Sequence, residues 1–148
     1  IRSCKYAPEG IRSAAGRRGD WGDFASFSEY ASTVNKNVLV LPMIETMEAV
    51  NNIDEILSVP GIDVALVGPL DLSISMGIPE DFLNPTYQET LNRIVAACSQ
   101  AGVTPGIWFI PGSQNPNDFI ARGFRIFTLP WTPWATDGIK NALTKINR

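Results

Sequence analysis

Apolar residues in this chain fall into short continuous runs separated by stretches with helical spacing. Four runs are rich in branched residues and bounded by polar residues, glycine or proline. Each run predicts a strand that is buried on both faces, as in a parallel sheet. The runs cover residues 38–44, 62–67, 103–110 and 124–129.

Apolar positions at helical spacing fill the intervals between the runs and predict helices. These helices cover residues 24–37, 47–57, 85–101, 116–122 and 133–147. The helix over 85–101 has the clearest ends, because Asn84 precedes Pro85 at its start and Gly102 follows its last residue. Strand and helix therefore alternate four times, which predicts βαβ units and a parallel sheet.

The alternation alone leaves a doubly wound sheet and a barrel both open. Four βα units are half of a (β/α)8 TIM barrel, which needs ~250 residues, whereas this α/β chain has 148. We therefore predict that residues 1–148 are a fragment of a single TIM-barrel domain. A half barrel exposes two parallel sheet edges, so we expect it to be unstable alone.

Composition narrows the classes of function. The hydrophobic fraction of 45% and charged fraction of 18% are typical of a globular protein. A net charge of −3 gives no electrostatic reason to expect nucleic acid, and no apolar stretch is long enough to span a membrane. No signal peptide opens the chain, so we expect a cytoplasmic protein. Cys4 and Cys98 are expected to be reduced thiols.

The chain has no histidine. This excludes a Ser-His-Asp site, a Cys-His site or a His-ligated zinc built from this chain alone. Catalysis must therefore rest on carboxylates, arginines, a metal, or residues supplied from elsewhere.

One acid follows each of the first two predicted strands, where ligands bind in α/β folds. Glu45 follows the first run, and Asp71 follows the second within Gly68-Pro69-Leu70-Asp71. Neighbouring parallel strands lie about 4.8 Å apart, so the two acids can converge on one ion. Carboxylates without His or Cys suit Mg²⁺ or Mn²⁺. The alternative is that Glu45 caps the following helix and Asp71 caps a turn.

Three segments in this order resemble the HpcH/HpaI aldolase family, the class II pyruvate aldolases. They are Tyr6–Ser13, Ile44–Ala49 and Val59–Gly77. The resemblance implies a barrel in which Glu45 and Asp71 hold the metal. It also implies that backbone amides of Gly68, Leu70 and Asp71 bind the carboxylate of pyruvate.

The resemblance also implies that residues 1–148 are the C-terminal part of the barrel domain. The family's catalytic arginine and histidine lie in its amino-terminal half, so the resemblance places them outside this chain and assigns no catalytic residue within it. Family members are commonly hexamers with a swapped carboxyl-terminal helix, so we expect a homo-oligomer. The expected activity is that of a divalent-metal-dependent carbon–carbon lyase that forms or uses a pyruvate enolate from a 2-keto acid.

The sequence departs from the family pattern at Met43, at Leu70 and in the tail over residues 129–134. These departures leave room for a divergent member of the macrophomate-synthase type, which decarboxylates oxaloacetate and joins the enolate to an acceptor. A coenzyme A thioester lyase, as in citrate and malyl-CoA lyases, and a non-catalytic barrel scaffold stay open as well. Alternation along a strand predicts that Trp108 and Phe109 point to opposite sides.

Overall fold

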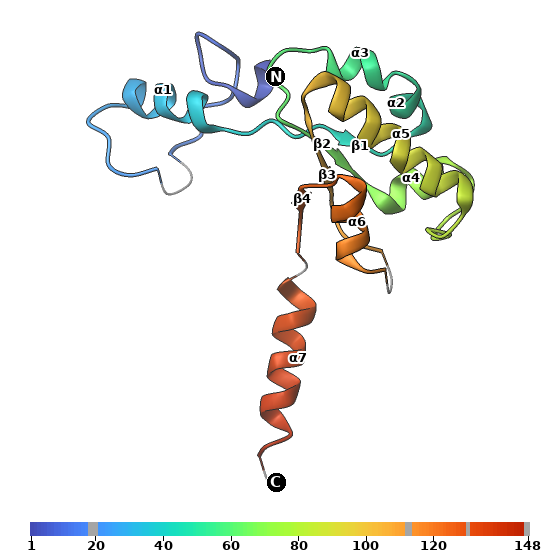
Figure 1. Cartoon of the computed structure of the whole chain (residues 1–148). Helices are drawn as coiled ribbons and strands as arrows, with labels where there is room; N and C mark the ends of the chain where they lie inside the picture. The colour runs from blue at the N-terminus through green and yellow to red at the C-terminus, as the bar shows by residue number, and fades with distance from the viewer. Residues whose placement is uncertain (18–20, 112–113, 130, 147–148) are drawn as a thin grey trace.

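A parallel sheet of four strands lies at the centre of the chain (Figure 1). The computed structural model describes residues 1–17, 21–111, 114–129 and 131–146. The strands follow one another across the sheet in chain order, and every neighbouring pair is parallel. They are β1 (Met43–Ile44), β2 (Val64–Val67), β3 (Thr104–Ile107) and β4 (Ile126–Phe127). This order confirms the predicted βα repeats and is that of half a (β/α)8 barrel.

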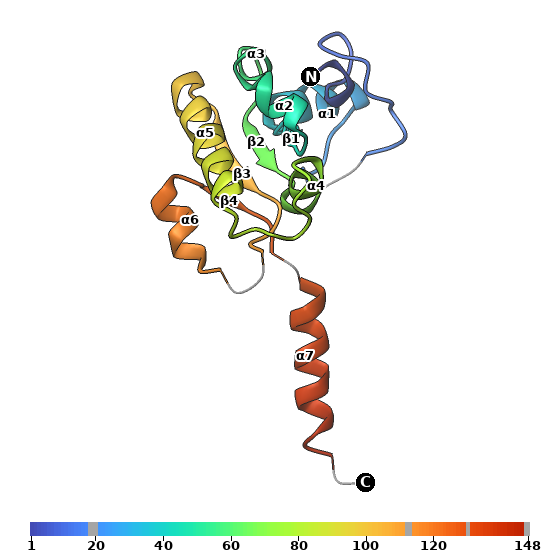
Figure 2. The same ribbon diagram turned by 90° about the vertical axis from the view of Figure 1, so that its right-hand side faces the viewer.

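Helices separate the strands, and most of them lie against the sheet (Figures 1 and 2). A short 3₁₀ helix, η1 (Arg2–Cys4), opens the chain. The α-helices are α1 (Phe27–Asn37), α2 (Met47–Asn51), α3 (Ile53–Leu57), α4 (Pro69–Ser75), α5 (Pro85–Ala101), α6 (Pro116–Arg122) and α7 (Trp131–Leu143). In both views α7 extends away from the rest of the molecule. No helix in the described ranges has the length and apolar character needed to cross a membrane.

The main core lies between one face of the sheet and helices α3 and α5. Four residues in register contribute to that face and define what we call the core row: Ile44, Val67, Ile107 and Phe127. The first three are buried and Phe127 packs against the same cluster. Leu91 and Ile94 of α5 are fully buried in this cluster as well. Hydrophobic burial therefore fixes which face of the sheet meets the helices.

The helices with clear end signals have the predicted bounds. The Asn84 side chain accepts a hydrogen bond from the Thr86 amide at 3.0 Å, and Gly102 ends α5 with a φ of 68°. This left-handed conformation favours glycine, because it costs other residues steric strain. Helix α6 likewise begins after Asn115 and ends before Gly123.

Other bounds differ from the prediction. The strands are shorter than their apolar runs, most of all β1, because Pro42 has no N–H to donate to a ladder. The chain still follows β2 before β1 begins, since the Val40 carbonyl accepts from the Asp63 amide at 3.0 Å. The helix predicted over 47–57 is broken at Asn52 into α2 and α3. Helix α4 was not predicted.

The predicted last helix over 133–147 begins two residues earlier, at Trp131, and its helical part ends at Leu143. Asn147 lies outside the described residues.

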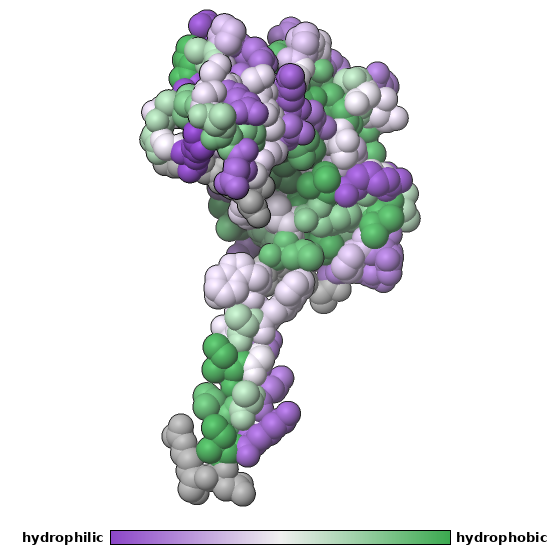
Figure 3. Space-filling model, turned by 90° about the vertical axis from the view of Figure 1, so that its left-hand side faces the viewer, coloured by the Kyte–Doolittle hydropathy of each residue, from purple (hydrophilic) through white to green (hydrophobic). Residues whose placement is uncertain are grey.

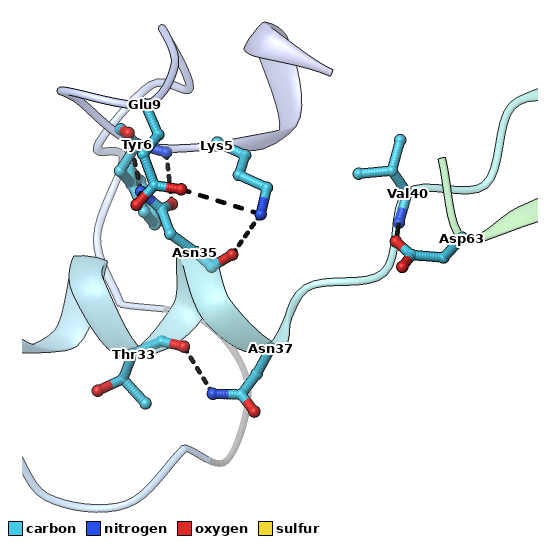
Figure 4. A network of polar contacts seen from close by, with 8 residues as sticks. All are labelled: Lys5, Tyr6, Glu9, Thr33, Asn35, Asn37, Val40 and Asp63. Atoms are coloured by element: carbon cyan, nitrogen blue, oxygen red, sulfur yellow. Dashed lines mark hydrogen bonds and ion pairs between the residues drawn. The ribbon is translucent and has the colours of Figure 1, made fainter. Parts of the chain in front are cut away.

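The buried side chain of Asn35 holds the first loop of the chain to α1 (Figure 4), beside the ring contacts of Tyr6 with Phe27 and Tyr30. Its Oδ1 accepts from the Tyr6 amide at 2.7 Å, and its Nδ2 donates to the Tyr6 carbonyl at 2.9 Å. Nδ2 also lies 3.3 Å from a Glu9 oxygen. One amide group thus pairs with both backbone groups of Tyr6, as a neighbouring strand would.

Candidate functional site

A row of four residues follows the strands at the carboxyl end of the sheet. This site row consists of Glu45, Gly68, Trp108 and Thr128. Three backbone hydrogen bonds hold it: Gly68 N to Ile44 O at 3.2 Å, Trp108 N to Val67 O at 2.9 Å, and Thr128 N to Ile107 O at 3.3 Å. Successive residues of a strand alternate in direction, so the site row faces away from the helices that cover the core row. The carboxyl end of a parallel sheet is where α/β proteins bind ligands.

The Glu45 side chain lies directly beside Gly68. A β-carbon built on Gly68 would meet both the Glu45 β-carbon and Oε2 at 3.0 Å, and the Met43 methyl carbon at 3.1 Å. These separations are shorter than ordinary van der Waals contact. The missing side chain at residue 68 therefore provides the space that the Glu45 carboxylate occupies.

Asp71 lies in the first turn of α4, which begins directly after Gly68. Its side chain is exposed, whereas Leu72 and Ser73 behind it are fully buried. The Ser73 hydroxyl donates to the Leu70 carbonyl at 2.7 Å and accepts from the Glu80 amide at 3.1 Å. Burial of these two residues and the Ser73 hydrogen bonds hold α4 in place. They thereby set the backbone position from which the Asp71 side chain extends.

The loops that carry Glu45 and Asp71 are linked by a side chain. The Ser75 hydroxyl at the end of α4 accepts from the Met47 amide, at the start of α2, at 2.9 Å. The sequence pattern does not single out Ser75, because the link depends on α4, a helix that the pattern does not predict.

The alternative role of Glu45 as a helix cap is wrong. Thr46 is the N-cap of α2, and its hydroxyl accepts from the Ala49 amide at 3.1 Å. Asp71 does lie in the first turn of its helix, where an acid is favoured by the helix dipole. Its alternative role as a helix-start acid is thus compatible with the fold, whereas Glu45 precedes the N-cap of its helix.

Of the three backbone amides expected to bind a substrate carboxylate, that of Gly68 is already engaged. The Gly68 amide already donates to Ile44 within the sheet. The amides of Leu70 and Asp71 lie in the first turn of α4, where N–H groups have no carbonyl partner within the helix. Gly68 therefore offers space rather than a donor, and the donors that a substrate carboxylate can use are those of Leu70 and Asp71.

The donor set fits a hard divalent cation better than a soft one. No group of three or more His, Cys, Asp or Glu side chains gathers anywhere in the described ranges. A cation at the carboxyl end of β1 and β2 would thus take two carboxylates from this chain. Mg²⁺ is commonly held in this way, with water and substrate oxygens in its other positions.

Trp108 and Phe109 directly follow β3, which ends at Ile107, and both line one cavity. Their predicted placement on opposite sides of the strand is therefore not confirmed. Trp108 belongs to the site row and is 51% exposed, whereas the Phe109 ring meets Phe82 edge-on at 6.5 Å between centroids. The strand register, which the sequence pattern does not specify, identifies Trp108 as the neighbour of Gly68.

Comparison with known proteins gives consistent matches. Residues 1–132 match the sequence profile described as HpcH/HpaI aldolase/citrate lyase. A 4-hydroxy-2-oxo-heptane-1,7-dioate aldolase of Shigella sonnei is 36% identical over 126 residues, which are 83% of this chain and 47% of that protein. A hydroxypyruvate/pyruvate aldolase of Roseobacter denitrificans is 32% identical over 107 residues, which are 72% of this chain and 42% of that protein.

Solved structures agree with the sequence matches. An HpcH/HpaI aldolase/citrate lyase family protein of Burkholderia cenocepacia superposes with a TM-score of 0.77 at 29% identity. The superposition covers 97% of this chain and 57% of that one. The chain spans about half the length of the curated relatives it matches.

Proposed function

Because the chain belongs to the HpcH/HpaI aldolase/citrate lyase family, we propose that it carries the metal-binding half of a carbon–carbon lyase that acts on 2-keto acids. Its relatives are aldolases, which supports a lyase. The observation that carries the proposal is the position of Glu45 over Gly68, one strand away from the helix that bears Asp71.

In this proposal Glu45 and Asp71 are the ligands of Mg²⁺ or Mn²⁺. A bound divalent cation would supply Lewis-acid stabilisation of the negative charge of a pyruvate enolate. The amides of Leu70 and Asp71 orient the substrate by donating hydrogen bonds to its carboxylate. Leu70, which is 37% exposed, stands at the rim of this position and limits its width.

The proposed reaction breaks the bond between carbons 3 and 4 of a 4-hydroxy-2-keto acid. The hydroxyl on carbon 4 loses its proton and becomes the carbonyl of an aldehyde. The electron pair of the broken bond passes to carbon 3, which then takes up a proton to give pyruvate. The chain contains no histidine, and we assign the proton transfers to no side chain of it.

The same enolate arises if carbon dioxide leaves carbon 3 of oxaloacetate, so the two lyase reactions require the same residues here. A thioester lyase would also require a cationic site for the nucleotide phosphates of coenzyme A. Assays with free 4-hydroxy-2-keto acids, oxaloacetate and malyl-CoA separate these activities. A scaffold without activity need not bind metal, so calorimetry with Mg²⁺ separates it from all three.

The decisive experiment combines Glu45→Gln with Asp71→Asn in the purified protein. We expect Mg²⁺ binding measured by calorimetry to be lost, and metal-dependent pyruvate release to stop. The matched control combines Glu48→Gln with Asp54→Asn, two exposed acids of α2 and α3. The control should retain both properties. Full Mg²⁺ affinity in the Glu45/Asp71 double variant would contradict the proposed ligands.

We also propose that the protein is a homo-oligomer in which α7 packs on another copy, with a hexamer expected from the family. None of the described residues of α7 is buried. Its apolar side chains share one face of the helix, as expected for a packing surface: Trp131, Trp134, Ala135, Ile139 and Leu143. Sedimentation equilibrium tests this assignment, and Ile139→Asp, which places a charge on that face, should shift the protein toward smaller species.

A further inference from the structure

An aromatic cavity opens at the carboxyl end of β3 and β4, where α7 begins. Its volume is about 700 Å³, within the range of pockets that bind small molecules. Six residues provide most of its character: Trp108, Phe109, Ile110, Gln114, Leu129 and Trp131. Figure 3 shows apolar side chains gathered on this side of the molecule, above the point where α7 leaves the body.

The cavity and the candidate metal site both adjoin the site row, and Trp108 belongs to that row and to the cavity lining. Trp108 lines the cavity and also stands next to Gly68 in the site row, joined by its amide to the Val67 carbonyl at 2.9 Å. Thr128, the last member of the site row, lines the cavity as well. A molecule with one end at Glu45 and Gly68 would therefore enter the cavity with its other end.

The residues that line the cavity favour uncharged ligand groups over charged ones. Among the described residues, those that line it include no Asp, Glu, Lys or Arg. A distal carboxylate, such as that of a heptane-1,7-dioate, would lose water there without gaining a cation, which is costly. A flat apolar ring would instead meet the indoles of Trp108 and Trp131, and aromatic pairs of this kind are favourable.

We propose that this cavity receives an uncharged aromatic group at the distal end of the substrate, so that the aldehyde partner is an aromatic aldehyde rather than a charged semialdehyde. This assignment rests on the proposed lyase function, which supplies the position of the 2-keto acid. Trp108 and Trp131 are then the residues that determine specificity for the aldehyde.

The first arm of the test measures aldol addition of pyruvate to benzaldehyde and to succinic semialdehyde in the presence of Mg²⁺. We expect kcat/KM to favour benzaldehyde by about tenfold or more, and Trp108→Ala to lower this ratio by about tenfold. Trp108→Phe retains a ring and should restore most of the ratio. Leu83→Ala, at an exposed apolar residue outside the cavity lining and outside α7, is the control and should keep the ratio of the unaltered protein.

The second arm measures binding without catalysis. The chain has four tryptophans, so their indole N–H signals in nitrogen-15 NMR spectra can be assigned by single substitutions. Titration with benzyl alcohol, which is neither a substrate nor a metal ligand of note, should shift the signals of Trp108 and Trp131. Trp21 packs against Tyr6 and Tyr30 in another cluster and should not respond.

The two arms distinguish failure of this proposal from failure of the lyase function. If benzyl alcohol shifts both indoles while no aldehyde reacts, the cavity stands and the lyase proposal falls. If aldol addition proceeds but succinic semialdehyde is preferred, or neither indole responds, the aromatic specificity is wrong.

Discussion

The Glu45 carboxylate lies where a side chain of residue 68 would be, because a β-carbon on Gly68 would stand 3.0 Å from its Oε2. Gly68 has an ordinary φ of −93°, so its backbone does not require glycine. Glycine is required at residue 68 because of the contact with the Glu45 side chain, and a substitution can test this directly.

We predict that Gly68→Ala weakens Mg²⁺ binding by about tenfold or more while the fold is kept at a cost of about 1–3 kcal/mol. The new methyl group must displace the Glu45 carboxylate or the Met43 methyl group. Calorimetry with Mg²⁺ and denaturant unfolding measure the two effects. Gly138→Ala is the control, since a β-carbon there meets nothing within 4 Å. Unchanged Mg²⁺ affinity in Gly68→Ala would argue against Glu45 as a ligand.

Gly10 is a second position that has no room for a side chain, and there the obstacle is backbone atoms. A β-carbon on Gly10 would collide with the carbonyl oxygens of both Arg2 and Lys5. The same two carbonyls accept hydrogen bonds from Ile11 and Arg12, so they cannot move without breaking the loop. We predict that Gly10→Ala lowers the free energy of unfolding by about 3 kcal/mol, measured by urea denaturation. A loss below about 1 kcal/mol would show that the loop tolerates rearrangement.

Asn35 provides a test of the polar contact that holds this loop to α1. Asn35→Ala removes the side chain that bonds both backbone groups of Tyr6, although the Tyr6 carbonyl still accepts from the Gly10 amide at 3.0 Å. The change should cost about 1–3 kcal/mol of unfolding free energy. Asn37→Ala serves as a control in the same helix, because its amide is exposed and donates to the Thr33 carbonyl one turn earlier. Its effect should stay within about 0.5 kcal/mol. Equal losses in the two variants would contradict the special role of Asn35.

The thiol of Cys98 makes stability depend on alkaline pH. Burial raises its pKa from 9.0 to about 11. Between these values the unfolded chain loses the proton and the folded chain keeps it, so stability is complete below about pH 9 and falls as pH rises. Between these two pKa values, each pH unit should lower the free energy of unfolding by about 1.4 kcal/mol through this thiol. Burial also raises the pKa of Tyr87, against a smaller opposing effect of Arg122, which adds to the loss at higher pH.

Urea unfolding at about pH 8 and about pH 10.5 measures this dependence. Cys98→Ala should be less stable at the lower pH, because a buried side chain is truncated, but should lose less on going to the higher pH. The same pH dependence in the variant and the unaltered chain would exclude Cys98 as its source.

The sequence predicted best those elements whose ends are marked by local chemistry. Asn84, Pro85 and Gly102 define α5 through hydrogen bonds and backbone angles that need no distant partner. Strand ends depend on the neighbouring strand, so an apolar run could not show that β1 covers only Met43–Ile44. Helix α4 depends on tertiary burial of Leu72 and could not be recognised from its Gly-Pro start.

For the site, the position of each acid after a strand was available from the sequence. The contact between Glu45 and Gly68 and the engagement of the Gly68 amide follow from the strand register, which a single sequence does not specify. The metal ligands themselves remain proposals that the Glu45 and Asp71 variants test.

The adjacency of the core row and the site row has a consequence for the evolution of this sheet. If β1 slipped by one residue along β2, Glu45 would turn toward the apolar helices and Ile44 would take its place at the opening. Such a slip would bury a carboxylate and expose a branched side chain in a single step. Selection for a well-packed core therefore also maintains the register of the site row. It does so without any contact between the core residues and the substrate.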